Sequence, residues 1–218
     1  MNYEQTTEWK NYCALMEERP EAFRNTGNID IITDVNQVEA FVEQTGKKIG
    51  VIYHSEYNLW VVDLVKGADG TYFAYERLMP AVVRGAVVTI PRHEGKYILL
   101  RQYRHALRDY QYAFPRGFGE DGITPEKNAG KEIAEELGAI VTGTKFLGNI
   151  VADSGCCGNP VDVYLCDITK PQLKEGYEGI HDVCAIEETE LKQWIREGKI
   201  TDGFSLAAWA LLREDGQT

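Results

Sequence analysis

The sequence lacks any apolar run that approaches the length of a membrane-spanning helix. Its first residues, Met-Asn-Tyr-Glu-Gln, do not have the pattern of a secretory signal peptide. The 5 cysteines are odd in number and lack the spacing of metal ligands. We therefore expect a protein that does not contact a membrane and that stays reduced in the cytoplasm.

The sequence also has few basic residues. It contains 23 Lys and Arg against 34 Asp and Glu, which gives a formal net charge of −11. This charge argues against nucleic acid as a partner. It opposes an anionic small-molecule substrate too, unless a divalent metal and a local cluster of arginines offset it. The hydrophobic share of 44% is ample for a core, and 218 residues allow one large domain or a domain with an appendage.

Residues 117–139 predict one short helix with defined ends. Thr124 can cap its start, Pro125 suits its first turn, and Gly138 can end it in the left-handed conformation. An apolar stripe recurs every four residues along this helix, at Ala129, Ile133 and Leu137.

Glu132, Glu135 and Glu136 lie three and four residues apart, so they share the face beside the apolar stripe. Two interpretations of this cluster are open. If the face meets bulk water, the glutamates are an ordinary solvated surface. If it meets a cleft, three clustered carboxylates call for a hard cation such as Mg²⁺ or Mn²⁺.

The same stretch resembles the signature of the Nudix hydrolases, which reads Gly, five residues, Glu, seven residues, then Arg-Glu-hydrophobic-x-Glu-Glu-x-Gly-hydrophobic. It departs from that signature at Ile123, where the family has Glu, and at Lys131, where it has Arg. In the family these two positions support the geometry of the loop and helix. The resemblance implies an α+β fold, the Nudix α/β/α sandwich around a mixed sheet. The signature matches at Gly117, Glu132, Ile133, Glu135, Glu136, Gly138 and Ala139.

The resemblance also implies a divalent cation, Mg²⁺ or Mn²⁺, as cofactor. Tyr177-Glu178-Gly179-Ile180 resembles an acidic loop of the relatives that supplies one further carboxylate, and Glu175 is taken as a surface residue. Catalytic roles are expected for Glu136, Glu178 and Glu135, and the general base is Glu178 or a glutamate of the helix. The expected metal ligands are Glu132, Glu135, Glu136, Glu178 and the backbone carbonyl of Arg116.

Arginines crowd the segment that precedes the signature, at Arg101, Arg104 and Arg108. They form surface salt bridges or bind phosphate, for which the guanidinium fork is suited. Gln102-Tyr103-Arg104 resembles a strand end of the ADP-ribose pyrophosphatases, a Nudix subfamily, that faces substrate phosphates. In a following stretch Ala113 stands where that subfamily has Glu, and Arg116 where it has Ala. The expected substrate-binding residues are Arg104, Arg108, Arg116 and Tyr112.

Residues 1–80 carry no catalytic constellation and predict a helical and β region ahead of a Nudix domain over residues 81–218. Helices are expected over 7–18 and 34–46, and strands over 29–32, 49–53, 58–65 and 71–78. The aromatics of this region form the core of a small sheet or a dimer surface. The resemblance favours a homodimer, because ADP-ribose pyrophosphatases pair or swap an N-terminal β-region. These aromatics are Tyr53, Tyr57, Trp60, Tyr72, Phe73 and Tyr75.

The second part predicts strands over 82–90, 97–103, 145–152 and 161–168, and helices over 188–197 and 205–212. The loop over 153–160 contains the adjacent residues Cys156 and Cys157, which are not expected to bridge each other and are taken as loop packing. His181 lies beside the acidic loop and is taken as structural.

Together these features predict metal-dependent hydrolysis of the pyrophosphate bond of ADP-ribose or a related nucleoside diphosphate sugar. The products would be a nucleoside monophosphate and a sugar phosphate. The alternative is a non-catalytic Nudix-fold protein that senses a nucleotide or serves as an interaction partner. The departures at Ile123, Lys131 and Ala113 support that alternative, and the complete set of carboxylates opposes it.

Overall fold

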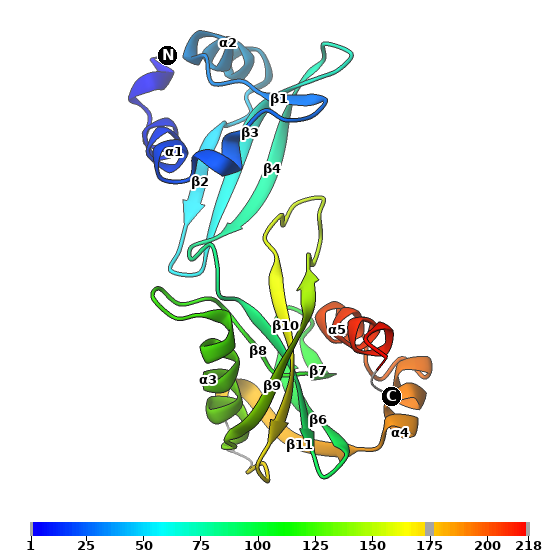
Figure 1. Ribbon diagram of the computed structural model, residues 1–218. Helices are drawn as coiled ribbons and strands as arrows, with labels where there is room; N and C mark the ends of the chain where they lie inside the picture. Colours follow the sequence, from blue (N-terminus) through cyan, green and yellow to red (C-terminus); the bar gives the residue numbers. More distant parts are fainter. Residues whose placement is uncertain (1, 173–176, 217–218) are drawn as a thin grey trace. The chain divides into compact units, whose positions relative to one another are not determined.

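The chain forms two units in the computed structural model, which describes residues 2–172 and 177–216 (Figure 1). The first unit comprises Met1–Ala81 and Asp153–Gly158, and the second comprises Val82–Ala152 and Asn159–Thr218. The predicted division after residue 80 differs by one residue and by the loop over 153–158. That loop groups with the first unit because its backbone carbonyls accept hydrogen bonds from Leu78 and Tyr75.

The first unit packs two helices against a four-stranded antiparallel sheet in which β3 is central. Asp34 caps the second helix by accepting from the amides of Asn36 and Gln37, and Gly46 ends it with a φ of 70°. The elements of this unit are η1 (Tyr3–Gln5), α1 (Thr7–Glu18), η2 (Pro20–Phe23), β1 (Ile29–Ile31), α2 (Val35–Thr45), β2 (Gly50–His54), β3 (Asn58–Gly67) and β4 (Tyr72–Pro80).

A buried ion pair lies at the centre of the first unit. Asp63 is 1% exposed, and its carboxylate accepts two hydrogen bonds from Arg77, at 2.6 and 2.9 Å, and one from the Tyr12 hydroxyl at 2.5 Å. Burial and the neighbouring Asp63 charge raise the pKa of Tyr12, so the hydroxyl remains the donor. The carboxylate is therefore fully bonded despite its burial.

Four aromatic side chains of the first unit are exposed. Tyr53 and Trp60 are cross-strand partners and are 62% and 44% exposed, and Tyr57 and Tyr72 are 53% and 40% exposed. These four side chains do not form a core within the unit. The prediction of a dimer surface stays a prediction.

The second unit is built on a seven-stranded mixed sheet in the order β11-β6-β5-β10-β9, with β7 beside β6 and β8 beside β5. The pairing of β10 with β5 is parallel and the other pairings are antiparallel. The elements are β5 (Val87–His93), β6 (Lys96–Arg104), β7 (Asp109–Ala113), β8 (Arg116–Gly117), α3 (Pro125–Leu137), β9 (Val141–Ile150), β10 (Val161–Ile168), η3 (Tyr177–Gly179), β11 (Ile180–Ile186), α4 (Glu188–Arg196) and α5 (Gly203–Glu214).

Helices cover both faces of this sheet, with α3 on one side and α4 and α5 on the other (Figure 1). Successive side chains of a strand point to opposite faces, and β6 serves both layers in this way. Ile98 and Leu100 pack with α3, whereas Tyr97 and Leu99 pack with α4 and α5. The predicted α/β/α sandwich around a mixed sheet is confirmed.

The predicted strand over residues 82–90 begins only at Val87. Gly85 has a φ of 99°, a backbone conformation that interrupts an extended strand and that glycine adopts without strain. A Cβ at Gly85 would also crowd the backbone of Gly119 at 3.2 Å. The glycine thus turns the chain toward the loop that leads into α3.

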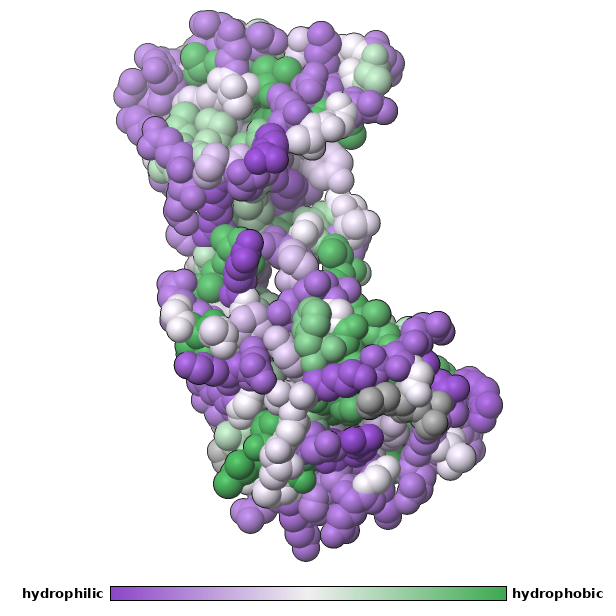
Figure 2. All heavy atoms as spheres, viewed as in Figure 1, coloured by the Kyte–Doolittle hydropathy of each residue, from purple (hydrophilic) through white to green (hydrophobic). Residues whose placement is uncertain are grey.

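Figure 2 shows hydrophilic residues over most of the face in view on each unit, with hydrophobic residues gathered in smaller patches. No helix among the described residues combines the length and apolar character required to cross a bilayer.

Candidate functional site

The helix α3 presents the glutamate cluster, and both of its predicted ends are present. The Thr124 hydroxyl accepts a hydrogen bond from the Lys127 amide, Pro125 is the first helical residue, and Gly138 ends the helix with a φ of 58°. The apolar stripe is fully buried and fixes the rotation of the helix about its axis. This rotation turns Glu136 inward and leaves Glu132 and Glu135 half-buried.

Glu136 is the most buried carboxylate of the site, with 3% of the residue exposed. One of its oxygens has no hydrogen-bond partner among the described residues, although the carboxylate accepts a hydrogen bond from the Arg116 amide. Burial first, and then the charges of Glu132 and Glu178, raise the pKa of Glu136 to about 8, against the opposing effects of Arg104 and the Arg116 amide. A buried carboxylate with an unbonded oxygen is a position that a cation would satisfy.

Burial likewise raises the pKa of Glu132 to about 7, with Glu135 and Glu178 adding to the shift and Lys131 opposing it. The Glu132 carboxylate lies directly against Gly117, where an added Cβ would overlap it. A side chain at Gly117 would make the flexible end of Glu132 move, so the glycine leaves room for this carboxylate at its present place in the site.

Glu135 is the more open member, with 36% of its side chain exposed. Its carboxylate lies 3.5 Å from the Lys131 ammonium and accepts a hydrogen bond of 3.5 Å from the Tyr177 hydroxyl. Lys131 also pairs with Glu120, three residues before the position of the missing family Glu at Ile123. A lysine on the helix and a displaced loop glutamate thus form an ion pair between loop and helix.

Glu178 comes from the segment before β11 and is exposed, with left-handed backbone angles of φ 45° and ψ 31°. The buried Gln102 side chain donates a hydrogen bond of 2.8 Å to its carbonyl and holds the turn against β6. The Glu178 charge acts on both Glu132 and Glu136, so the three carboxylates share one region. Glu175 lies outside the described residues.

Two arginines adjoin this acidic region. Burial lowers the pKa of Arg104, and the nearby charge of Arg116 lowers it further, while Asp202, Glu136 and Glu178 oppose the shift. The Nε atoms of Arg104 and Arg116 are both buried and have no hydrogen-bond partner among the described residues. Two neighbouring guanidinium groups with unused donors are suited to an anion such as phosphate.

Arg116 is held by residues that the sequence did not identify as part of the site. Its guanidinium lies over the Phe204 ring, 4.9 Å from the centroid, and 4.0 Å from the Asp202 carboxylate. Asp202 also caps α5 by accepting from the amide and hydroxyl of Ser205. The sequence did contain one signal for Asp202. An Asp directly before a helix is typical of an N-cap, which would have placed this carboxylate at the start of α5.

Arg108 and Tyr112 differ from the other predicted substrate residues in their surroundings. Arg108 lies in the turn between β6 and β7, with its guanidinium 3.0 Å from the His105 ring nitrogen. Tyr112 is half-buried and packs on Trp194 of α4, with 4.7 Å between ring centroids. The Arg108 contact lies in the turn of the β6–β7 hairpin, which we call the β7 hairpin, and the Tyr112 contact packs this hairpin on α4.

The loop between β8 and α3 is braced by Asn128, which is fully buried in α3. Its side-chain amide donates hydrogen bonds of 2.8 Å to the carbonyls of Gly85 and Phe118. Asn128 was not among the predicted site residues, because a polar residue within a helix usually points to solvent. It fixes the loop that carries Gly117 relative to the glutamates.

The donor set fits a hard divalent cation, since it offers carboxylate oxygens, one of them buried and unbonded, whose mutual repulsion a cation would offset. As the side chains lie among the described residues, however, no group of three or more His, Cys, Asp or Glu could hold a metal ion.

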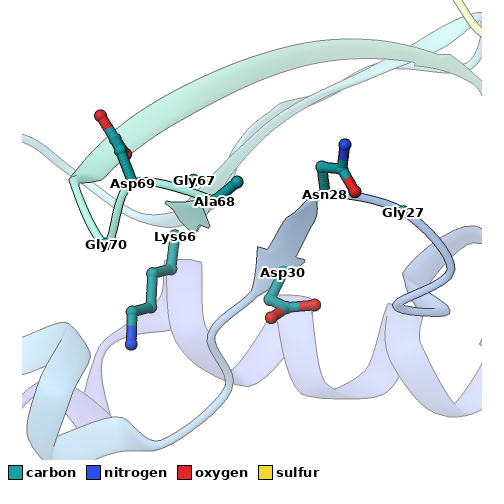
Figure 3. A pocket seen from close by; sticks show the side chains of 8 residues that line it. All are labelled: Gly27, Asn28, Asp30, Lys66, Gly67, Ala68, Asp69 and Gly70. Atoms are coloured by element: carbon teal, nitrogen blue, oxygen red, sulfur yellow. The ribbon is translucent and has the colours of Figure 1, made fainter.

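A separate surface pocket lies in the first unit, lined by Gly27, Asn28, Asp30 and residues 66–70 (Figure 3). Asp30 and Lys66 are cross-strand partners, and Figure 3 shows their side chains on the same side of the strand pair. The pocket contains none of the predicted site residues and offers one lysine and two carboxylates at its rim. None of its lining residues belongs to the carboxylate cluster of the second unit.

Comparison with known proteins gives one curated relative, the ADP compounds hydrolase NudE of Escherichia coli (strain K12). It is 25% identical over 111 residues, which cover 51% of this chain and 59% of the relative. No family model matches the chain. A crystal structure of ADP compounds hydrolase superposes with a TM-score of 0.69 and 17% sequence identity, covering 89% of this chain and 98% of that chain.

The sequence match spans less than two thirds of the relative's length, and the structural match extends over almost the whole of the neighbouring chain. Both relatives are ADP compounds hydrolases by name, which agrees with the resemblance noted in the sequence. The chain is similar in sequence to the ADP compounds hydrolase NudE and in fold to the crystal structure of ADP compounds hydrolase.

Proposed function

We propose that this protein is a divalent-metal-dependent hydrolase of the pyrophosphate bond of ADP-ribose or a related nucleoside diphosphate sugar. The products are a nucleoside monophosphate and a sugar phosphate. The observation that carries the proposal is the juxtaposition of Glu132, Glu136 and Glu178 with the unpaired guanidinium donors of Arg104 and Arg116. The names of the relatives, both ADP compounds hydrolases, support the substrate class.

Glu132, Glu136 and Glu178 would hold the cation, together with the backbone carbonyl of Arg116, and Glu135 serves as a further ligand or supports it. Mg²⁺ or Mn²⁺, when bound, neutralises phosphate charge and lowers the pKa of a water molecule. The protein's contribution is to keep these carboxylates together in a buried position despite their repulsion. Burial first, and then the repulsion between the carboxylates, raises the pKa of Glu132 and of Glu136.

Arg104 and Arg116 bind the phosphates and orient the bridge relative to the carboxylates. Their donors are geometrically fixed, because Arg116 rests on Phe204 and both Nε atoms are buried. Fixed donors stabilise developing negative charge without reorganisation. The proton of the attacking water passes to Glu178 or to a glutamate of α3.

The proposal includes a homodimer and a cytoplasmic location. The exposed aromatics Tyr53, Tyr57, Trp60 and Tyr72 support the dimer, since aromatics are enriched at interfaces. All five cysteines are free, which agrees with a reducing compartment. Size-exclusion chromatography with light scattering would test the dimer, and Trp60→Ser should shift a dimer toward monomer.

The competing function is a non-catalytic nucleotide sensor, supported by the departures at Ile123, Lys131 and Ala113. The Lys131–Glu120 pair weakens this alternative, because it restores the ionic contact between loop and helix. Ala113 is 1% exposed, so the position of the family Glu offers no polar group here.

A substrate panel separates the two functions. Purified protein with Mg²⁺ is incubated with ADP-ribose, ADP-glucose, GDP-mannose and UDP-glucose, and the products are separated by chromatography. We expect cleavage of ADP-ribose, with a preference over the other three below about a thousandfold, because the buried Ala113 removes a polar anchor worth roughly 1.5–3 kcal/mol. Glu136→Gln serves as the matched control and should lose most activity. Binding of ADP-ribose without any cleavage would establish the sensor instead.

A further inference from the structure

Cys156 and Cys157 are adjacent in the chain, and their sulfur atoms lie 3.4 Å apart. Neighbouring side chains in an extended backbone point to opposite sides, so this proximity depends on a turn. The turn is closed by hydrogen bonds from both cysteine amides to the Asp153 carbonyl, at 3.2 and 2.6 Å. The Asp153 carboxylate accepts from the Gly155 amide at 2.9 Å and fixes the start of the same turn.

The cysteine turn is fastened to β4 of the first unit. The Leu78 amide donates a hydrogen bond of 2.9 Å to the Cys156 carbonyl, and the Tyr75 hydroxyl donates one of 2.6 Å to the Gly155 carbonyl. Strand β4 pairs with β3 along its other edge, so the turn occupies part of an otherwise open strand edge. The position of the Cys156 carbonyl therefore decides whether that edge is covered.

We propose that Cys156 and Cys157 form a redox-responsive vicinal dithiol, which low-molecular-weight disulfides convert to an intramolecular disulfide, and that this oxidation releases the turn from the edge of β4. The expectation that adjacent cysteines do not bridge holds for extended backbone, and the turn removes that obstacle. Both side chains are partly exposed and can meet a small disulfide in solution.

The reaction is two successive thiol–disulfide exchanges. One cysteine loses a proton to solvent and its sulfur attacks the external disulfide, which forms a mixed disulfide and expels one small thiolate. The second cysteine then attacks the protein sulfur of the mixed disulfide and expels the second small thiolate. The protein loses two hydrogens and two electrons in total, and the external disulfide is reduced to two thiols.

The bridge would be strained and therefore readily reversed. Successive Cα atoms are about 3.8 Å apart across a trans peptide, which is shorter than the roughly 4.4 Å at the lower end for disulfides. The strain can be relieved only by moving the peptide that carries the Cys157 amide and the Cys156 carbonyl. These two groups make the hydrogen bonds to Asp153 and Leu78. Strained disulfides belong to the labile, regulatory class.

The reduced pair is stable until an oxidant arrives. Hydrogen bonds to Cys157 and to Asp153 raise the pKa of Cys156 to about 11, which keeps that thiol protonated. Burial raises the pKa of the remaining thiols, Cys13, Cys166 and Cys184, and Cys166 is 0% exposed and closed to a disulfide reagent in solution.

The first test identifies the bridge. The whole protein is equilibrated with oxidised and reduced glutathione in varied ratio, alkylated with N-ethylmaleimide, digested and analysed by mass spectrometry. We expect the peptide with both cysteines to lose two hydrogens and to escape alkylation. Cys156→Ser and Cys157→Ser, the matched controls, should each carry one glutathione instead. Two glutathione adducts on the wild-type peptide, or full alkylation at every ratio, would overturn the dithiol.

The second test follows the β4 edge by amide hydrogen exchange. Oxidation should accelerate exchange of the Leu78 amide by about tenfold in the wild type, as loss of one hydrogen bond implies. Amides of β3 that bond within the sheet should not change, and Cys157→Ser treated with the same glutathione should keep the slow Leu78 rate. A bridged peptide with an unchanged Leu78 rate would refute the release of the turn.

Discussion

Replacing Glu136 by Gln is expected to stabilise the metal-free protein while removing most of its hydrolytic activity. The carboxylate is 3% exposed, and its pKa is about 8 against an ordinary value of 4.5. The unfolded chain therefore releases this proton near pH 4.5, whereas the folded chain keeps it until about pH 8. Stability from this group is fully present below pH 4.5 and is lost progressively as the pH rises through 8.

The magnitude follows from the interval between the two pKa values. At pH 7 the folded protein holds a proton that the unfolded chain lost about 2.5 pH units lower, at about 1.4 kcal/mol per unit. The penalty is thus about 3 kcal/mol relative to a side chain that never ionises. Gln is such a side chain and nearly matches Glu in shape, so the variant escapes the penalty.

The assay is urea unfolding in the presence of chelator at pH 5, 7 and 9. Trp194 and Trp209 report on the second unit if Trp9 and Trp60 are replaced by Phe. We expect the stability advantage of Glu136→Gln to be small at pH 5, about 3 kcal/mol at pH 7 and larger at pH 9. Exposed Glu126 offers a control, and Glu126→Gln should show no comparable gain at any pH.

Mg²⁺ should reverse the ranking, because it stabilises only a protein that binds it. The wild type should gain stability with increasing Mg²⁺, and Glu136→Gln should gain much less. If the Gln variant is less stable than the wild type at pH 7 in chelator, the claim that the buried Glu136 carboxylate destabilises the metal-free protein is refuted. An advantage that is equal at pH 5 and pH 9 would exclude ionisation as its cause.

Three further predictions concern other parts of the chain. Glu178→Gln should lower kcat at least tenfold while Glu175→Gln leaves it unchanged; equal effects in steady-state kinetics would remove Glu178 from the metal site. Arg116→Ala should raise KM for ADP-ribose by about ten- to a hundredfold, as loss of a charged hydrogen bond worth roughly 1.5–3 kcal/mol implies, and Arg108→Ala should change KM less than threefold. The reverse order would show that the β7 hairpin binds the phosphates. Asp63→Ala should destabilise the first unit by about 3–5 kcal/mol, because the partly buried Arg77 guanidinium and the Tyr12 hydroxyl lose their carboxylate partner, and a loss below about 1 kcal/mol by urea unfolding would contradict the importance of this pair.

Local signals predicted the elements that carry the glutamates. The helix α3 starts after Thr124 and ends before Gly138 as expected, since capping and the left-handed stop depend on neighbouring residues alone. Strand β10 was predicted over its full length, 161–168, because its apolar, β-favouring residues are bounded by turn residues on the N-terminal side, and its central residues Val163–Cys166 are buried.

Long-range contacts explain what the sequence did not predict. Strand β11 has its hydrogen-bond partners in β6, from Ile180 with Gln102 to Ile186 with Tyr97, far earlier in the chain, and its mixed pattern gives no local sign of that pairing. The substitution of Glu120 for the missing signature glutamate depends on where the loop folds back toward Lys131. Phe204 joins the site only because α5 begins beside Arg116.

Substitutions at Gly117 should impair the site even though this residue has no side chain. It carries no reactive group, yet a single added methyl would occupy the volume of the Glu132 carboxylate. A larger residue at Gly117 could be accommodated if the flexible end of Glu132 moved, and that movement would take the carboxylate away from its place in the site. In a saturation library scored for growth or turnover, we expect substitutions at Gly117 to reduce function as substitutions of the glutamates do. Glycine contributes no functional group of its own and only leaves room for the Glu132 carboxylate.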